Sequence, residues 1–182
     1  LIPAFGLPER RPSADGLQIS HPTAITFGDQ ITLLGYSLEP DSVQPGDSVT
    51  VQLYLTSAQP LTMPYSLGLW LVSALPGEGE RLTGLDTWPG RGNYPTLAWR
   101  PDEVLVDRYR LRIPERVARA QAWVLQVTFT APDDGGRLPV FVDGLAAGDR
   151  AVLGMVRVGA SQPTEPPQRS RLEGGPAFDG SI

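Results

Sequence analysis

The chain has 182 residues, of which 41% are hydrophobic and 19% are charged, and its formal net charge is −5. These values are typical of a globular protein, and the acidic balance argues against a nucleic-acid partner or an anionic membrane surface. With no cysteine and a single histidine, the chain lacks the residues for disulfides, thiolate catalysis and the usual transition-metal sites. The 20 glycines and 19 prolines predict short strands joined by tight turns.

Residues 1–22 carry four prolines and no sustained alternation, which predicts an extended lead-in. Its histidine, His21, is expected to be an exposed side chain away from any strand. Residues 23–159 alternate between apolar and polar positions, and residues 160–182 form a polar tail rich in proline and glycine. No apolar run is long enough to span a membrane, so we expect a soluble chain, and Leu1 in place of a methionine suggests a fragment or a processed product.

The central segment predicts an all-β fold. Residues 48–56 are the clearest strand, because apolar side chains occupy every second position, whereas residues 65–74 are apolar on both faces, as in a central strand. The spacing of such runs predicts an antiparallel β-sandwich of eight to nine strands, immunoglobulin-like or jelly-roll-like, within residues 23–159. The expected strands are residues 24–27, 31–38, 48–56, 65–74, 81–88, 106–113, 122–131, 138–142 and 151–158.

A loop rich in glycine and proline follows the fifth of these strands and holds two of the four tryptophans, Trp88 and Trp99. Tryptophan and tyrosine rings stack on the apolar face of a sugar while polar neighbours bind its hydroxyls, so Trp88, Arg91, Asn93 and Tyr94 are candidate ligand-binding residues. For Trp88 and Tyr94 a purely structural role is equally compatible with the pattern. For Trp99 we favour a structural role, in which its ring plugs one end of the sandwich.

No catalytic motif is present, and we expect no catalytic residue, metal or cofactor. The carboxylates nearest the loop, Asp86, Asp102, Glu103 and Asp107, allow an acid/base glycoside hydrolase as a remote alternative. The simpler interpretation is that Asp86 and Asp107 cap turns or pair with arginines.

Several short stretches carry a family resemblance. They are Ile2 to Phe5 with Pro8, Phe27 to Tyr36, Pro45 to Asp47, Tyr94 to Thr96, Trp99 to Glu103, Val106-Asp107 with Tyr109 and Leu111, and Arg137 to Val140. Over residues 1–158 the chain resembles a recurrent extracytoplasmic domain of bacterial, especially Chloroflexi-type, membrane proteins, found after the membrane helices of polytopic glycosyltransferases that use lipid-linked sugars. It departs from that domain's pattern at Leu53 to Thr56 and at Ala122-Trp123, where apolar character is kept.

The resemblance implies a non-catalytic β-sandwich in the cell envelope, outside the cytoplasmic membrane and tethered in the full-length protein. It supplies no functional residues, and it favours a fold-building role for Tyr94 and Trp99. The leading hypothesis is an accessory domain that binds glycan or a lipid-linked sugar, or that packs on its parent membrane protein. The alternative is an interaction module that uses a sheet edge and the C-terminal tail, with residues 176–182 docking as an added strand or the whole tail, residues 160–182, mediating self-association.

Overall fold

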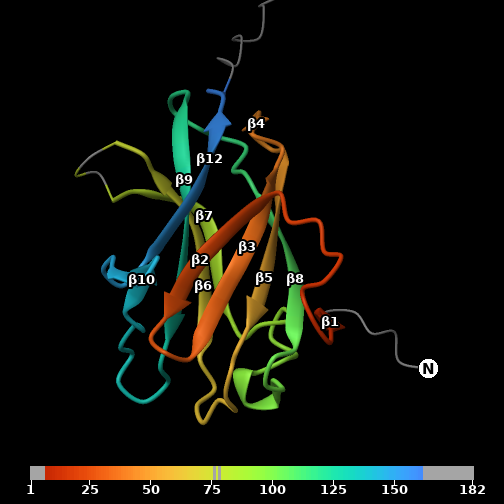
Figure 1. The fold of residues 1–182 in the computed structure, drawn as a ribbon. Coiled ribbons are helices and arrows are strands. Elements are labelled where there is room, and N and C mark those ends of the chain that lie inside the picture. The colour runs from red at the N-terminus through yellow and green to blue at the C-terminus, as the bar shows by residue number, and fades with distance from the viewer. Residues whose placement is uncertain (1–6, 76, 78, 162–182) are drawn as a thin grey trace, which may run out of the picture.

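The computed structural model describes residues 7–75, 77 and 79–161, which form two β-sheets packed face to face (Figure 1). The larger sheet has seven strands in the order β1-β8-β5-β3-β2-β10-β11, and the smaller has five in the order β4-β12-β9-β6-β7. Among the pairings of named strands, only that of β4 with β12 is parallel. The expected all-β antiparallel sandwich is therefore confirmed.

The strands of the larger sheet are β1 (Glu9–Arg11), β2 (His21–Phe27), β3 (Ile31–Glu39), β5 (Ser48–Thr56), β8 (Val104–Arg112), β10 (Val140–Val142) and β11 (Leu145–Ala146). Those of the smaller sheet are β4 (Ser42–Val43), β6 (Ser66–Ser73), β7 (Arg81–Thr87), β9 (Gln121–Thr130) and β12 (Ala151–Val158). A 3₁₀ turn, η1 (Thr96–Ala98), lies between β7 and β8.

Eight of the strands have seven residues or more, and each matches one of the expected segments to within a few residues. The other four, β1, β4, β10 and β11, have only two or three residues and lie at or next to the sheet edges. Only β10 overlaps an expected segment, since two or three residues are too few to show an alternating pattern.

The inner faces of both sheets supply the core. Along β5 the alternate residues Val49, Val51, Leu53 and Leu55 are all 0% exposed, as their spacing predicts. The rings of Phe27 and Phe129, one from each sheet, meet edge to face with centroids 4.9 Å apart. Burial of each such side chain contributes roughly 1.5–3 kcal/mol, which is the main force that holds the two sheets together.

The lead-in is more closely attached to the sandwich than its sequence indicates. Residues Glu9–Arg11 pair with β8 as the edge strand β1, and β2 begins at His21, whose ring stacks on Tyr36 with a centroid distance of 4.8 Å. The prediction that His21 lies away from any strand is therefore wrong. The close approach depends on Gly35, where an added Cβ would lie 2.6 Å from the carbonyl oxygen of His21.

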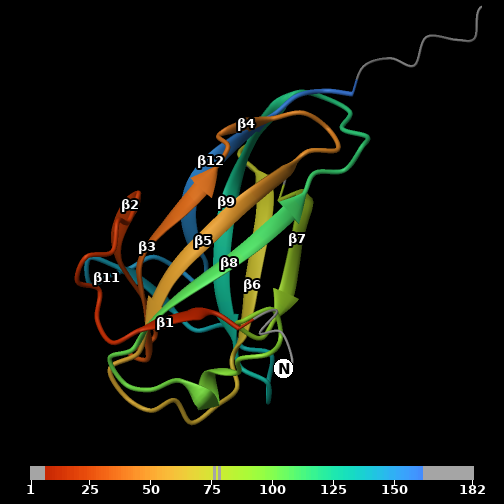
Figure 2. The same ribbon diagram turned by 90° about the vertical axis from the view of Figure 1, so that its right-hand side faces the viewer.

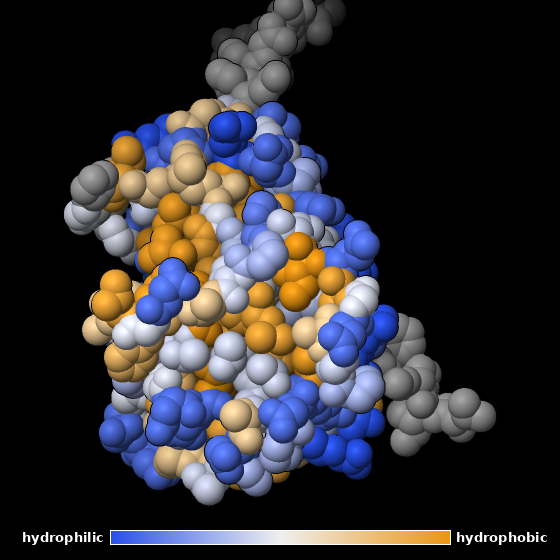
Figure 3. All heavy atoms as spheres, viewed as in Figure 1, coloured by the Kyte–Doolittle hydropathy of each residue, from blue (hydrophilic) through white to orange (hydrophobic). Residues whose placement is uncertain are grey.

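The two edges of the sandwich differ in what they expose. Figure 2 shows β1 across the end of β8, and β7 beside β8 where the two sheets meet. On the side seen in Figure 3, hydrophobic surface gathers over β10, β11 and the first half of β12. The large exposed hydrophobic side chains of β10, β11 and β12 are Val142, Leu145, Val152 and Met155. Within the described ranges, no helix is long and apolar enough to cross a membrane.

Candidate functional site

The outer face of the smaller sheet carries a polar hollow of about 220 Å³ centred on Trp70. It combines one indole, one carboxylate, one amide, two hydroxyls and three guanidinium groups. The lining residues are Trp70, Arg81, Asp86, Gln126, Thr128, Thr130, Arg137 and Arg150. We refer to this set as the Trp70 hollow.

Strand register brings these side chains to one face. Trp70 on β6 lies opposite Gly84 on β7 and Gln126 on β9. Directly opposed residues of antiparallel strands point to the same side of the sheet, and so do residues two positions apart on one strand. Because Leu69 and Leu71 are buried in the core, Trp70 and its partners face outward.

Two glycines make room for the side chains of the hollow. A Cβ on Gly84 would lie 2.6 Å from two carbons of the Trp70 indole, so the ring lies directly over the backbone of β7. A Cβ on Gly68 would lie 2.3 Å from the Thr128 hydroxyl oxygen and 2.8 Å from a carboxylate oxygen of Asp86. The hydroxyl and the carboxylate thus converge over Gly68 from the two neighbouring strands.

The indole is fixed by two further contacts. Its Nε1–H donates to Oδ1 of Asp86 at 3.2 Å, and the guanidinium carbon of Arg81 lies 4.3 Å from the ring centroid. A cation over an aromatic face is attracted by the ring quadrupole. The side chains of Gln126 and Thr130 have no hydrogen-bond partner among the residues that the structure describes, so they are free to bind a ligand.

The two remaining arginines of the hollow share one carboxylate. Asp149 accepts from Nη1 of Arg137 at 3.0 Å through one oxygen and pairs with Nε of Arg150 at 3.4 Å through the other. The first contact is a hydrogen bond that uses one of the five N–H donors of the Arg137 guanidinium, and the second is an ion pair. Asp149 therefore contacts both arginines, and these two contacts leave most of the arginine N–H donors unused.

The loop predicted to bind a ligand is organised by its own contacts. Trp88 is 45% exposed, but Arg91 has a φ of 55° and its Nε donates to the carbonyl of Arg108 at 3.3 Å. The Asn93 amide donates to the carbonyl of Arg91 at 3.5 Å, and the Tyr94 hydroxyl donates to a main-chain carbonyl, that of Ala98, at 3.0 Å. Donors of Arg91, Asn93 and Tyr94 that could bind a sugar are thus partly occupied by hydrogen bonds within the protein.

A buried carboxylate anchors this loop to the larger sheet. Asp107, which is 3% exposed, accepts from the Gly90 amide at 2.7 Å and from the Tyr109 hydroxyl. Burial raises the pKa of Asp107, while these two hydrogen bonds and the charge of Arg91 oppose the rise. The turn-capping interpretation of Asp107 agrees with these contacts.

The structural role expected of Trp99 agrees with its position. Trp99 is 5% exposed and belongs to the main core cluster. Next to it, the hydroxyl of the fully buried Thr96 donates to the Met63 carbonyl at 2.6 Å and accepts from the Tyr65 amide at 2.9 Å. The end of the loop thus closes the sandwich through both apolar and polar contacts.

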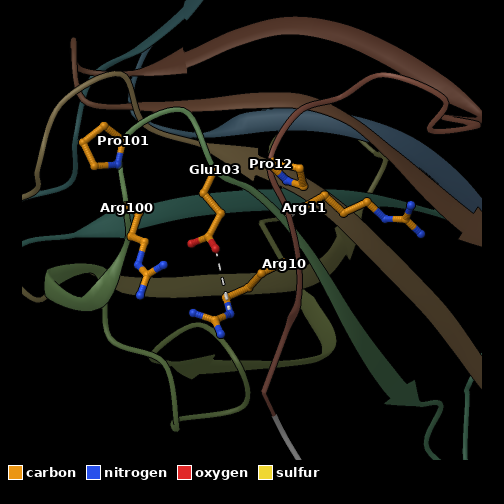
Figure 4. Close-up of a pocket in the computed structure, with 6 residues that line it drawn as sticks. All are labelled: Arg10, Arg11, Pro12, Arg100, Pro101 and Glu103. Atoms are coloured by element: carbon orange, nitrogen blue, oxygen red, sulfur yellow. Dashed lines mark ion pairs between the residues drawn. The ribbon is translucent and has the colours of Figure 1, made fainter.

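A second pocket, of about 620 Å³, lies between β1 and the residues that follow Trp99. Arg10, Arg100 and Glu103 extend side by side into it, and Arg11 points away (Figure 4). Arg10 is 3.9 Å from Glu103 and also contacts Tyr94, with its Nη1 3.4 Å from the hydroxyl. These contacts join β1 to the loop, so we assign this pocket a structural role.

The carboxylates considered for acid/base chemistry do not share one cavity. Asp86 lines the Trp70 hollow on the smaller sheet, whereas Asp107 is buried in the larger sheet with its hydrogen bonds directed to Gly90 and Tyr109. Among the residues described, no group of three or more histidine, cysteine, aspartate or glutamate side chains could hold a metal ion.

No known protein-family model matches the chain, and no curated protein matches its sequence. Among solved structures, the C-terminal domain of Wzt is similar with a TM-score of 0.51 at 12% identity, over 80% of this chain and 84% of that one. The alkylpurine DNA glycosylase AlkC of Pseudomonas fluorescens gives 0.37 at 14%, over 72% and 31%. AvmM, which catalyses macrocyclization in alchivemycin A biosynthesis, gives 0.38 at 12%, over 86% and 98%. The first likeness supports the all-β fold, and the other two scores are too low to indicate a common fold.

Sequence reasoning missed Trp70. Its segment is apolar on both faces, so alternation did not show which side chains point outward. The available signal was the pair of glycines, Gly68 in the same strand and Gly84 in the next, because glycine inside a strand marks a close approach.

Proposed function

We propose that this chain is a non-catalytic domain that binds glycan in the Trp70 hollow. The observation that carries the proposal is an outward-facing indole, seated over a glycine, with carboxylate, amide and hydroxyl groups around it. Sugars are recognised by such a combination, because an aromatic ring covers their C–H groups and polar side chains bind their hydroxyls.

Gly84 lies on the edge strand β7, and the Trp70 ring packed over it recovers part of the stability that this glycine costs. Each glycine inside a strand costs roughly 0.5–1 kcal/mol relative to alanine. Trp70 is only partly buried, and it occupies the solvent side of the sheet rather than the core. The feature that favours a binding role is the set of polar side chains that gather around the ring.

We place the domain outside the cytoplasmic membrane and tethered to a parent membrane protein, on the resemblance carried by its sequence stretches. The glycan could then be the lipid-linked sugar or the product of that protein. Packing on the parent is a second candidate function, and the exposed apolar side chains of β10 to β12 favour it. The acid/base hydrolase is not proposed, because Asp86 and Asp107 do not share a cavity.

The test compares two tryptophans that the structure separates. The chain and its Trp70→Ala and Trp88→Ala variants are titrated with a panel of oligosaccharides and followed by calorimetry. We expect Trp70→Ala to weaken binding at least tenfold, about 1.4 kcal/mol, because the ring is the apolar surface of the site. Trp88→Ala should bind like the parent and serves as the matched control.

Circular dichroism and the unfolding midpoint of both variants show whether the fold is intact. Equal binding by the parent and the folded Trp70→Ala variant would overturn the proposed site. If only the Trp88→Ala variant lost affinity for the oligosaccharides, the binding site would be the loop between β7 and β8. If the unmutated chain binds no oligosaccharide of the panel, packing on the parent membrane protein becomes the favoured function.

A further inference from the structure

The Trp70 hollow is positively charged in an acidic protein. Three of the 15 basic residues of the chain, Arg81, Arg137 and Arg150, line it beside a single carboxylate, Asp86. When Asp149 is counted as the partner of two of these arginines, three positive charges face two negative ones and leave one positive charge. The formal net charge of the whole chain is −5, so this sign is local to the hollow.

We propose that the glycan bound in the Trp70 hollow carries a carboxylate, as a uronic acid does. This inference rests on the proposed function and names the substrate class of the same site. The planar guanidinium fork matches a carboxylate with two parallel hydrogen bonds, and one carboxylate balances the remaining charge of the hollow. A neutral sugar would leave that charge unbalanced.

The three arginines have different positions in the hollow and therefore different roles. Arg137 and Arg150 both contact Asp149, so the two guanidinium groups lie close together and their remaining N–H groups bind the carboxylate. Arg81 lies over the indole and has no ion pair among the described residues, so a sugar that stacks on this face displaces its guanidinium, which then binds the sugar from beside the ring. Gln126, Thr128 and Thr130 lie between these groups and bind hydroxyls.

A local charge excess also has a simpler interpretation, in which the arginines only solubilise the sheet face. That interpretation predicts no difference between an acidic sugar and its neutral derivative. It also predicts that any arginine on the same face contributes equally to weak, salt-dependent attraction. Arg157, exposed on β12 and outside the lining of the hollow, provides that comparison.

The experiment uses two ligands that differ only at the carboxyl group, namely oligogalacturonides, which are charged, and the same oligomers fully methyl-esterified, which are neutral. The parent should bind the acid at least tenfold more tightly than the ester, and added salt should reduce this preference. Arg137→Gln and Arg150→Gln should each remove most of the preference, because they weaken binding of the acid far more than binding of the ester. Arg157→Gln should retain both affinities.

The outcomes separate this inference from the proposed function. Equal affinity of the parent for acid and ester overturns the carboxylate inference and leaves glycan binding intact. Loss of acid preference in Arg157→Gln to the same extent as in Arg137→Gln also overturns it, because the effect would then be non-specific. Absence of binding to either oligomer and to the wider panel contradicts the proposed function itself.

Discussion

At the scale of single residues, Trp70 depends on the absence of side chains beside it. Gly84 leaves space for the indole, and Gly68 leaves space for the carboxylate of Asp86 and the hydroxyl of Thr128. The Asp86 carboxylate in turn accepts the indole N–H at 3.2 Å. A side chain at position 68 would therefore displace Asp86 and weaken its hydrogen bond to the Trp70 ring, although Gly68 itself presents no group to a ligand.

Gly68→Ala tests this dependence. The new Cβ would displace Asp86 and Thr128, while alanine gains strand stability of roughly 0.5–1 kcal/mol that offsets part of the crowding. We expect the variant to fold and to bind glycan at least tenfold more weakly. The displaced Asp86 carboxylate would no longer accept the hydrogen bond from Trp70 Nε1–H that holds the ring in the site. Thr50→Ala, an outward position on the other sheet, is the control and should bind normally.

Binding is measured by calorimetry and stability by urea unfolding. Parent-like affinity in Gly68→Ala would show that Asp86 and Thr128 need not converge over that glycine. A variant that does not fold is replaced by Thr128→Val, which removes the hydroxyl without adding bulk over the strand. That variant should also bind glycan more weakly than the parent.

At the scale of elements, the loop between β7 and β8 is held by a buried acid. Asp107 lies on the inward face of β8 and accepts hydrogen bonds from the Gly90 amide and the Tyr109 hydroxyl. Its pKa is raised by burial, so the native state holds this proton more tightly than the unfolded chain does. Above the unfolded pKa of about 4, the contribution of Asp107 to stability therefore falls as the pH rises.

The Asp107→Asn variant isolates this effect, since asparagine keeps an acceptor for the same two donors and does not titrate. We expect the free energy of unfolding of the parent, relative to the variant, to decrease between about pH 4 and pH 7. Urea unfolding of both proteins across this range measures the difference and cancels the contribution of other carboxylates. A constant difference, or one that rises with pH, contradicts the assignment.

The strands themselves were predictable, and the site was not. The range 48–56 agrees with β5 residue for residue, because alternation is a local property of the sequence. The Trp70 hollow depends on which residue of β7 lies opposite which residue of β6, with a register shift between Leu71 and Val72. Single-strand patterns do not contain that pairing. The loop was singled out for its aromatic residues, and the structure assigns part of that aromatic content to closing the sandwich.

At the scale of the whole molecule, the proposed site and the exposed apolar surface are neighbours. Val152 of β12 lies opposite Gln126 of β9, which lines the Trp70 hollow. A long polymer bound in the hollow would have apolar surface beside it, and so would a partner protein. The tail lies outside the described residues from position 162 onward, so its predicted role in docking and self-association stays a prediction.

The most direct test of the account is to map the bound glycan on the whole chain. Backbone amide shifts are recorded by NMR while an oligogalacturonide is added to the isotope-labelled protein. We predict that the largest shifts fall on the outward residues of β6, β7 and β9, with Trp70 Nε1–H among them. Shifts confined to residues 88–99 and to β8 would contradict the central claim that the smaller sheet carries the binding site.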